Sequence, residues 1–292
     1  MSNQNGLVRL IVVMFHNPHD LPPLLASVER HMQVACEVVV WDNGGCAAEI
    51  HKLQELYAAR LPIYLGGNGQ NLGFGKAVNL AATMPTAHVP SSLLLLNPDA
   101  VLANDFTSAH LNELQLHNAL TGFQVFDDAA MQKRQASARR FPNIMTAVAG
   151  REGVLTKLWP QNPFSKAYLQ DDLPTTGWQQ VDWVSGSALW VSIDRWRELG
   201  GYDERYFLYV EDVDLGREAQ RKGVPVYFYP EIKVVHYIGG TRKGSINKIA
   251  EWHHHMGMLA YFLKWNGLFG WLLSPVVAPL ILLRYALRTL RS

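Results

Sequence analysis

Apolar, β-branched runs that alternate with segments of helical spacing constrain this chain more than any other feature. Such runs occur at 7–14, 37–41 and 91–96, and each can form a strand buried on both faces, as parallel sheets require. Residues 21–32 carry apolar side chains at helical spacing, and 50–57 also reads as helix. Strands that alternate with helices indicate βαβ units, so we predict an α/β fold with a mostly parallel central sheet.

Two of these runs end in turns that contain an aspartate. Asp42 opens the turn at 42–45, and Asp99 closes the turn at 97–99, which also contains Asn97. Ligands of open α/β sheets bind outside the carboxyl ends of the strands, which is where both aspartates are expected. Asp99 could ligate Mg²⁺ or Mn²⁺, which prefer oxygen ligands, although Asn-Pro-Asp is equally good as an ordinary turn.

Composition excludes several classes of protein. Of 292 residues, 48% are hydrophobic and 17% charged, which supports a real core and contact with a membrane, and the net charge of +1 gives no field that recruits nucleic acid. Cys36 and Cys46 are too few for a disulfide framework or a zinc site. The first residues lack the pattern of a signal peptide, so we expect a cytoplasmic protein.

A second acidic cluster comprises Glu211, Asp212 and Asp214. Three carboxylates within four residues repel one another, which raises a pKa or requires a cation. If a helix begins here, Glu211, Asp214 and Glu218 share one face and Asp212 lies on another. A solvated first helical turn is the alternative, but the aromatic and apolar residues at 206–210 favour a walled pocket.

The glycine-rich loop at 66–75 differs from the dinucleotide-binding fingerprint. Leu72 stands where that pattern needs its third glycine, and the loop comes several elements too late, so hydride transfer is disfavoured. The backbone amides near Gly73 and Gly75 could instead donate hydrogen bonds to a nucleotide diphosphate.

Histidines give weaker signals. His236 ends an apolar run, where a core residue and a metal ligand are both reasonable interpretations. The histidines at 253–255 are consecutive, and consecutive helical residues point about 100° apart. We therefore expect at most one of the three to face a site.

The C-terminal part is apolar and flanked by basic residues. Residues 266–283 carry no charge, which meets the threshold of roughly 18 residues for a membrane span, but Pro275 and Pro279 interrupt them. Basic residues on both sides favour a segment that lies in or re-enters the cytoplasmic leaflet; a buried pair of helices is the alternative. We predict a catalytic domain over 1–262 and a helical membrane-associating segment over 263–292, with the proline-rich 129–176 region on the acceptor side.

Taken together, these positions resemble the family 2 inverting glycosyltransferases with a GT-A fold, a Rossmann-like fold that binds nucleotide sugars, and among them the bacterial rhamnosyltransferases of surface polysaccharide synthesis. The resemblance runs in order from about residue 7 to 262. The acidic motif at 200–215 is its specific part. The matching segments are 10–13, 39–44, 71–75 with Asn79, 96–99, 139–142, 181–186, 200–215, His236 and 252–261.

The resemblance implies roles for individual residues. Asp42 would read the donor's base, and Asp99 with His236 would hold Mg²⁺ or Mn²⁺ on its diphosphate. Asp212 would be the catalytic base, with Glu211 as the alternative. Many relatives have aspartate at Asn97, which implies weaker metal binding here. Other expected donor-site residues are Asn71, Gly73, Gly75, Asn97 and Trp183, and Arg139, Arg140 and Arg242 would hold phosphates of the donor or of a lipid-diphosphate acceptor.

The function implied is transfer of L-rhamnose from dTDP-rhamnose to a lipid-linked glycan, by a protein peripherally attached to the inner face of the cell membrane. Alternatives are the same fold with a UDP-sugar donor, such as UDP-galactose or UDP-GlcNAc, and a non-catalytic sugar-nucleotide-binding subunit of an assembly complex. The joint presence of Asp99, Asp212 and His236 disfavours the non-catalytic alternative. The acceptor, linkage and oligomeric state stay open.

Overall fold

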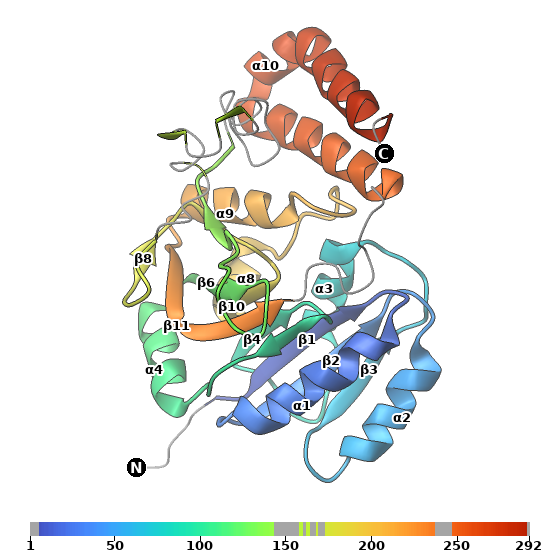
Figure 1. Cartoon of the computed structure of the whole chain (residues 1–292), viewed down its shortest axis with the longest axis vertical. Helices are drawn as coiled ribbons and strands as arrows, with labels where there is room; N and C mark the ends of the chain where they lie inside the picture. The colour runs from blue at the N-terminus through green and yellow to red at the C-terminus, as the bar shows by residue number, and fades with distance from the viewer. Residues whose placement is uncertain are drawn as a thin grey trace.

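A curved mixed sheet with helices on both faces forms the body of the molecule, and a helical hairpin stands at one end (Figure 1). The computed structural model describes residues 6–142, 158–159, 162–163, 168, 173–236 and 247–290. Within these residues the strand order of the large sheet is β3-β2-β1-β4-β10-β6-β11-β5, and β8 pairs with β11.

The first half of the sheet is parallel. Strands β1 (Val8–Met14), β2 (Cys36–Asp42), β3 (Ile63–Gly67) and β4 (Ser92–Leu96) lie side by side in one direction. The carboxyl ends of β2 and β4 therefore meet at one edge of the sheet, as the βαβ pattern predicted.

The second half of the sheet is mixed. β10 (Ala188–Ser192) runs antiparallel to both β4 and β6 (Leu120–Phe126), and β11 (Val226–His236) is parallel to β6. β5 (Ala100–Leu102) and β8 (Gln179–Gln180) pair antiparallel with β11. The prediction of an α/β fold with a mostly parallel sheet is confirmed, since β6 and β11 also run in the direction of β1 to β4 and only β10, β5 and β8 run against it. No helical crossover joins β4 directly to β10, so nothing fixes β10 in the parallel direction.

Alternation along the strands divides the core between the two faces. In β1, Leu10 and Val12 pack with α1, α2 and α4, whereas Ile11 and Val13 pack with α3, α8 and α9. The helices on the two faces are α1 (Leu21–His31), α2 (Ala47–Tyr57), α3 (Phe74–Thr83), α4 (Ser108–His117), α8 (Ile193–Leu199) and α9 (Glu211–Lys222), with a 3₁₀ turn η1 (Pro18–Asp20) and a small sheet of β7 (Ala138–Arg139) and β9 (Trp183–Val184).

The C-terminal helix α10 (Lys248–Thr289) consists of two arms. They meet at Gly267, whose φ of 51° and ψ of −134° lie outside helical values, and Pro275 and Pro279 lie inside the second arm without ending it. The arms fold back on each other (Figure 1), and an ion pair of 2.8 Å joins Arg288 to Glu251.

The hairpin is a pair of helices but not a buried one. Its most apolar 18-residue window has a mean hydropathy of 1.7 and is 6% buried, so the helix is apolar and long enough to cross a membrane by those criteria. The alternative of a buried pair of helices is therefore wrong, because the two helices are present but the apolar window is not buried. The first arm packs on the core, where Tyr261 joins Tyr206, Val210 and Val213 in one cluster.

Candidate active site

Asp99 and His236 meet where β4 and β11 end. The antiparallel register sets His236 opposite Ala100, and Oδ1 of Asp99 lies 2.9 Å from Nε2 of His236. Asp99 is one-third exposed and His236 is mostly covered. A carboxylate oxygen and an imidazole nitrogen in contact at an accessible edge are a donor set that suits Mn²⁺ and similar cations. The residues present therefore fit a divalent cation.

Asn97 and Gln135 surround the same histidine. Nδ2 of Asn97 lies 3.2 Å from Nε2 of His236. Nε2 of Gln135 donates to the backbone oxygen of His236 at 3.0 Å, and its Oε1 lies 3.4 Å from Nδ1. This contact orients the imidazole so that Nε2 faces Asp99. Sequence reasoning missed Gln135, since nothing in the chain links two residues that are 101 positions apart.

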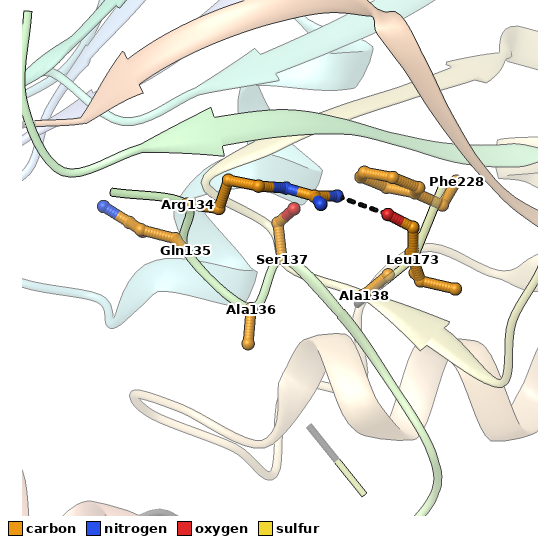
Figure 2. Close-up of a pocket in the computed structure, with 7 residues that line it drawn as sticks. All are labelled: Arg134, Gln135, Ala136, Ser137, Ala138, Leu173 and Phe228. Carbon is orange, nitrogen blue, oxygen red and sulfur yellow. Dashed lines mark hydrogen bonds between the residues drawn. The ribbon is translucent and has the colours of Figure 1, made fainter. Parts of the chain in front are cut away.

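A small cavity borders the segment 134–138 (Figure 2). Its volume of about 10 Å³ is enough for about one water molecule and falls far below the roughly 300–1,000 Å³ typical of ligand pockets. Figure 2 shows the guanidinium of Arg134 reaching the backbone oxygen of Leu173, at 2.8 Å, and Arg134 also donates to Gln124 at 2.8 Å. The cavity is too small for a nucleotide sugar, and Arg134 anchors the segment that leads to Arg139.

Glu211 and Asp212 begin α9 and have unlike surroundings. Glu211 is 5% exposed, and its Oε2 has no hydrogen-bond partner among the described residues. Burial, and then the charge of Asp212, raise the pKa of Glu211 well above its usual range. Asp212 is only half-buried and accepts hydrogen bonds from the amides of Gly186 at 3.3 Å and Val213 at 2.9 Å.

The pKa of Asp212 is also raised by burial, but the Gly186 amide and then the charge of Arg139 act in the opposite direction. The Gly186 amide and the charge of Arg139 thus favour the charged form of Asp212, whereas burial favours the neutral form of Glu211. The pair therefore consists of a more accessible carboxyl group with partners for its charge and a buried one whose surroundings favour a proton.

The turn at 185–187 connects the two acidic motifs. The amide of Asn97 donates to the backbone oxygen of Ser187 at 3.2 Å, and the amide of Gly186 reaches Asp212. A Cβ atom at Gly186 would lie 2.8 Å from the hydroxyl of Tyr202, so the close packing requires glycine there. The turn thus places Asn97 and Asp212 at the same edge of the sheet.

Two residues before α9 have left-handed backbone conformations. Tyr209 has a φ of 67° and Val210 a φ of 73°. A β-branched residue at positive φ is strained by on the order of 1–3 kcal/mol, and packing must maintain it. Val210 is buried against the first arm of α10, where a Cβ at Gly257 would lie 3.1 Å from it. The first arm therefore supports the turn that presents Glu211 and Asp212.

Asp214 is structural rather than a third group of the site. Its Oδ1 accepts hydrogen bonds from the Tyr206 hydroxyl at 3.0 Å and the Trp265 indole at 2.7 Å, and its Oδ2 pairs with Lys264 at 2.6 Å. The helical-face prediction is confirmed, since Glu211 and Asp214 are buried and Asp212 is not. Asp214 thereby joins α9 to α10.

Asp42 ends β2 and is 1% exposed. Its Oδ1 accepts hydrogen bonds from the amides of Gly44 at 3.1 Å, Gly45 at 2.8 Å and Cys46 at 2.9 Å. This oxygen therefore shapes the turn, which leaves Oδ2, near Gly69, for contact with a ligand. Its expected role in reading the base stays a prediction.

Asn43, which sequence reasoning did not single out, connects that turn to the glycine-rich loop. Its Oδ1 accepts a hydrogen bond from the Leu72 amide at 2.9 Å, and its Nδ2 donates to Asn71 at 3.1 Å. The amide of Gly73 donates to Asn71 Oδ1 at 3.1 Å, so this amide already has a partner within the loop.

Two glycines of the loop are required by close packing. Gly73 has a φ of 83°, and a Cβ there would lie 2.4 Å from the backbone oxygen of Phe207. Gly75 lies in the first turn of α3, and a Cβ there would lie 3.0 Å from Tyr202 and 3.7 Å from Glu211. The loop therefore rests directly on the segment that precedes α9.

The predicted phosphate-binding arginines separate in space. The guanidinium of Arg139 lies over the ring of Trp183, 5.2 Å from the ring centre, and its positive charge acts to lower the pKa of Asp212. Arg140 is exposed and faces Asp182 at 3.4 Å. Trp183 is buried, and its indole nitrogen donates a hydrogen bond to the backbone oxygen of Arg140 at 2.8 Å. Trp183 therefore provides a fixed surface on which the guanidinium of Arg139 packs. Arg242 lies outside the described residues.

The three consecutive histidines take different environments. His253 stacks on Phe207 at 4.3 Å, away from the other two. Ligand atoms of His254, His255 and Glu251 all lie within 4.8 Å of one another. The three histidines therefore do not form one group, although ligand atoms of His254 and His255 both lie near Glu251.

Comparisons with known proteins give relatives in sequence. The N-acetylglucosaminyl-diphospho-decaprenol L-rhamnosyltransferase of Mycobacterium tuberculosis is 30% identical over 271 residues, which cover 89% of this chain and 84% of the relative. The rhamnosyltransferase WbbL of Escherichia coli is 25% identical over 193 residues, which cover 64% of this chain and 69% of that protein. No family model matches the chain.

Solved structures share the fold. The structure of GalNAc-T7 with UDP, GalNAc and Mn²⁺ matches at a TM-score of 0.61 and 14% identity, over 84% of this chain and 45% of that one. The mannosyltransferase PcManGT of Pyrobaculum calidifontis, in complex with GDP-Man and Mn²⁺, matches at 0.54 and 14% identity, over 89% of this chain and 64% of that one. At such identities the similarity concerns the fold alone.

Proposed function

This chain belongs to the rhamnosyltransferase family of glycosyltransferases with the GT-A fold, and we propose that it is an inverting enzyme that transfers L-rhamnose from dTDP-rhamnose to a lipid-linked glycan. The acceptor class is argued from the Mycobacterium tuberculosis relative, whose name specifies a sugar joined by a diphosphate to a polyprenol. The donor sugar is inferred from the names of both relatives, which specify transfer of a rhamnosyl group.

One observation carries the proposal. The turn at 185–187 bonds to Asn97 on one side and to Asp212 on the other, so the pair Asp99–His236 and an accessible carboxylate share one sheet edge. A donor diphosphate at the pair and an acceptor hydroxyl at Asp212 would then be held side by side. Such positioning of two reactants is a large part of catalysis.

Asp212 is the proposed base. Its carboxylate, kept anionic by the Gly186 amide and Arg139, takes the proton of the acceptor hydroxyl as that oxygen attacks the anomeric carbon. The new C–O bond forms on the face opposite the leaving nucleotide, and the bond to the diphosphate oxygen breaks with its electron pair. Glu211 is buried and its pKa is raised well above the usual range, which favours its neutral form and leaves Asp212 as the proposed base.

Asp99 and His236 are the proposed ligands of Mg²⁺ or Mn²⁺. When bound, such a cation neutralises negative charge on the departing diphosphate. Gln135 holds the imidazole in place from behind, and Asp42 remains the proposed contact of the donor's base.

Membrane attachment through α10 would set the enzyme on the cytoplasmic face, where nucleotide sugars are found with the lipid-linked acceptor. The second arm carries the exposed apolar side chains that suit this role, among them Phe269, Trp271 and Leu272. The proposed boundary between 1–262 and 263–292 falls within the first arm, close to the anchoring residue Lys264.

The test is a donor panel with purified full-length protein, Mn²⁺ and a short-chain prenyl diphosphate N-acetylglucosamine acceptor. We expect turnover with dTDP-rhamnose and a product of inverted anomeric configuration by nuclear magnetic resonance. Turnover only with UDP-galactose or UDP-GlcNAc would replace the donor, and a retained configuration would reject the mechanism. Binding of nucleotide sugars without turnover would support a non-catalytic subunit.

A further inference from the structure

A group of basic side chains gathers where the hairpin approaches the Glu211–Asp212 turn. We call Arg139, His254, Arg284 and Arg288 the basic cluster. Arg139 comes from β7 on the body of the molecule, and the other three come from the two arms of α10. The hairpin brings its arms together through the Arg288–Glu251 pair and through the rings of His255 and Tyr285, 5.7 Å apart.

The pKa of His254 reflects its burial and the positive charges around it. Burial, and then the positive charges of His255, Arg284, Arg288 and Arg139, lower the pKa of His254 to about 4. At neutral pH its imidazole is uncharged and can donate one hydrogen bond. Its ring packs edge-on against Tyr209 at 5.9 Å, so it belongs to the wall beside the Glu211–Asp212 turn.

Tyr168 connects the cluster to the proposed base. Burial raises the pKa of its hydroxyl; the charge and a hydrogen bond of Arg139 lower it, Asp212 raises it, and Arg284 lowers it. Tyr168 therefore lies within electrostatic reach of Arg139, Asp212 and Arg284 together. Arg139 and Arg284 both act electrostatically on Tyr168 and on His254, which places the cluster beside Asp212.

A cation would not bind here, although His254, His255 and Glu251 have suitable spacing. Arg288 already occupies one oxygen of Glu251 at 2.8 Å, and the arginines of the cluster oppose a second positive charge. The same features favour an anion with several oxygens, which guanidinium groups bind in a bidentate manner.

Apolar surface begins directly beside the cluster. Leu283 and Leu287 flank Arg284 on the second arm and are 54% and 48% exposed, and Leu280, one turn earlier, is 60% exposed. A ligand that spans Asp212, the basic cluster and this surface needs a hydroxylated head, a multivalent anion and an apolar chain in that order.

We propose that the basic cluster binds the diphosphate of the lipid-linked acceptor, with the acceptor's sugar at Asp212 and its prenyl chain along the second arm of α10. This assignment rests on the proposed function, because it names the part of the chain that recognises that function's acceptor. It makes the hairpin an element of substrate recognition as well as of attachment.

The test measures binding of farnesyl diphosphate, farnesol and dTDP with Mn²⁺ to the full-length protein in detergent. We expect Arg284→Gln to weaken farnesyl diphosphate binding about tenfold or more, since a charge-assisted bidentate contact is lost. Binding of farnesol and of dTDP should not change. Arg284→Lys, which keeps the helix and the charge, should give a smaller loss and tests the site even if Arg284→Gln lowers stability. Arg197→Gln, an exposed arginine of α8, is the matched control.

Other results overturn the assignment. Equal losses for farnesyl diphosphate and farnesol would indicate an apolar or purely structural role, and a loss for dTDP would move Arg284 to the donor site. Unchanged farnesyl diphosphate binding with weaker binding to phosphatidylglycerol vesicles would indicate a surface for phospholipid headgroups. These binding measurements need no donor sugar. If Arg284→Gln selectively weakens farnesyl diphosphate binding but the wild type does not transfer rhamnose, the diphosphate subsite stands and only the proposed function is rejected. Normal rhamnose transfer by Arg284→Gln, with an unchanged KM for the acceptor, would reject only the subsite.

Discussion

At the scale of single residues, burial separates side chains that the sequence presents as equals. Glu211 and Asp212 are adjacent, yet Glu211 is enclosed with an unpartnered oxygen among the described residues and Asp212 is only partly buried with two amide donors. Because a charge needs solvent or hydrogen bonds, the surroundings of Asp212 favour its charged form more than those of Glu211 do. Neighbouring positions of one motif therefore have different chemical roles.

Asp212→Asn tests the base. The amide retains the size of the side chain but cannot accept the proton, so we expect transfer to fall by roughly 10²–10⁴-fold with unchanged affinity for dTDP. The measurement is steady-state transfer alongside calorimetric dTDP binding. Glu218→Gln, on the same helix and in a surface pair with Arg221, should leave both values unchanged. Normal turnover by Asp212→Asn would instead make Glu211 the better candidate.

Glu211→Gln tests the buried acid through stability. The pKa of Glu211 is raised in the folded protein above its ordinary value of 4.5. Between the two values the native state keeps a proton that the unfolded chain has released, so the free energy of unfolding falls as pH rises. Glutamine does not titrate, and the variant should gain stability relative to the wild type as pH increases from 4 to 8. Urea denaturation at each pH gives the difference; a difference independent of pH would contradict the assignment. Glu113→Gln, an exposed glutamate of α4, is the control.

The metal ligands make a third prediction. We expect Mn²⁺ to tighten dTDP binding to the wild type, and Asp99→Asn to remove that effect because the site loses its anionic ligand. Gln135→Ala should weaken Mn²⁺ binding roughly 10–100-fold, since the imidazole loses its orienting partner. Calorimetry with and without Mn²⁺ is the measurement, and Gln180→Ala at exposed β8 is the control. Wild-type binding that ignores Mn²⁺ would remove Asp99 and His236 from these roles.

At the scale of elements, α9 and the first arm of α10 act as one unit. Asp214 receives bonds from Tyr206, Lys264 and Trp265, and the strained turn at 209–210 packs beneath Gly257. The first arm, which leads to the exposed apolar second arm, is therefore fixed to the helix that carries Asp212. The position of the base depends on this junction because the left-handed turn needs support.

Asp214→Ala tests the junction. Removing one partner of a buried ion pair typically costs roughly 3–5 kcal/mol, and the lower end is expected here because Lys264 keeps its contact with Asp203 at 2.9 Å. The midpoint of urea denaturation measures the loss, and Asp194→Ala, at an exposed position of α8, should cost less than about 0.5 kcal/mol. Unchanged stability with lost dTDP binding would place Asp214 in the active site.

At the scale of the whole molecule, the apolar hairpin lies at one end of the body, and the proposed function requires this arrangement to bring a soluble donor and a lipid-linked acceptor together. In Figure 1 the second arm of α10 stands at the opposite end from α1 and α2. Its apolar side chains include Leu268, Phe269, Trp271 and Leu272, all more than 60% exposed. A patch of this kind on a soluble body marks a binding surface.

The double change Trp271→Glu with Leu272→Glu tests the surface. Each buried apolar side chain contributes about 1.5–3 kcal/mol, so losing two should weaken binding to vesicles about tenfold or more. Sedimentation with phosphatidylglycerol vesicles is the measurement. Leu56→Glu with Val89→Glu alters equally exposed apolar residues elsewhere, at 63% and 81%, and should leave binding unchanged. Equal effects of both pairs would remove the hairpin from membrane attachment.

The sequence by itself determined the strands and helices of the first half, the turns that present Asp42 and Asp99, and the helix start at Glu211. These features follow from local periodicity and turn chemistry, which act over a few residues. It also predicted correctly which acidic side chains of α9 share a face.

Only the tertiary structure decided that β10 inserts antiparallel beside β4 and that Gln135 supports His236. It also decided that Asp214 anchors α10 and that Arg139 lies near both arms of α10. Each of these contacts joins segments far apart in the chain, and their formation depends on register and packing that no local pattern contains. Burial acts in the same way, since adjacent carboxylates differ only in what the rest of the fold places around them.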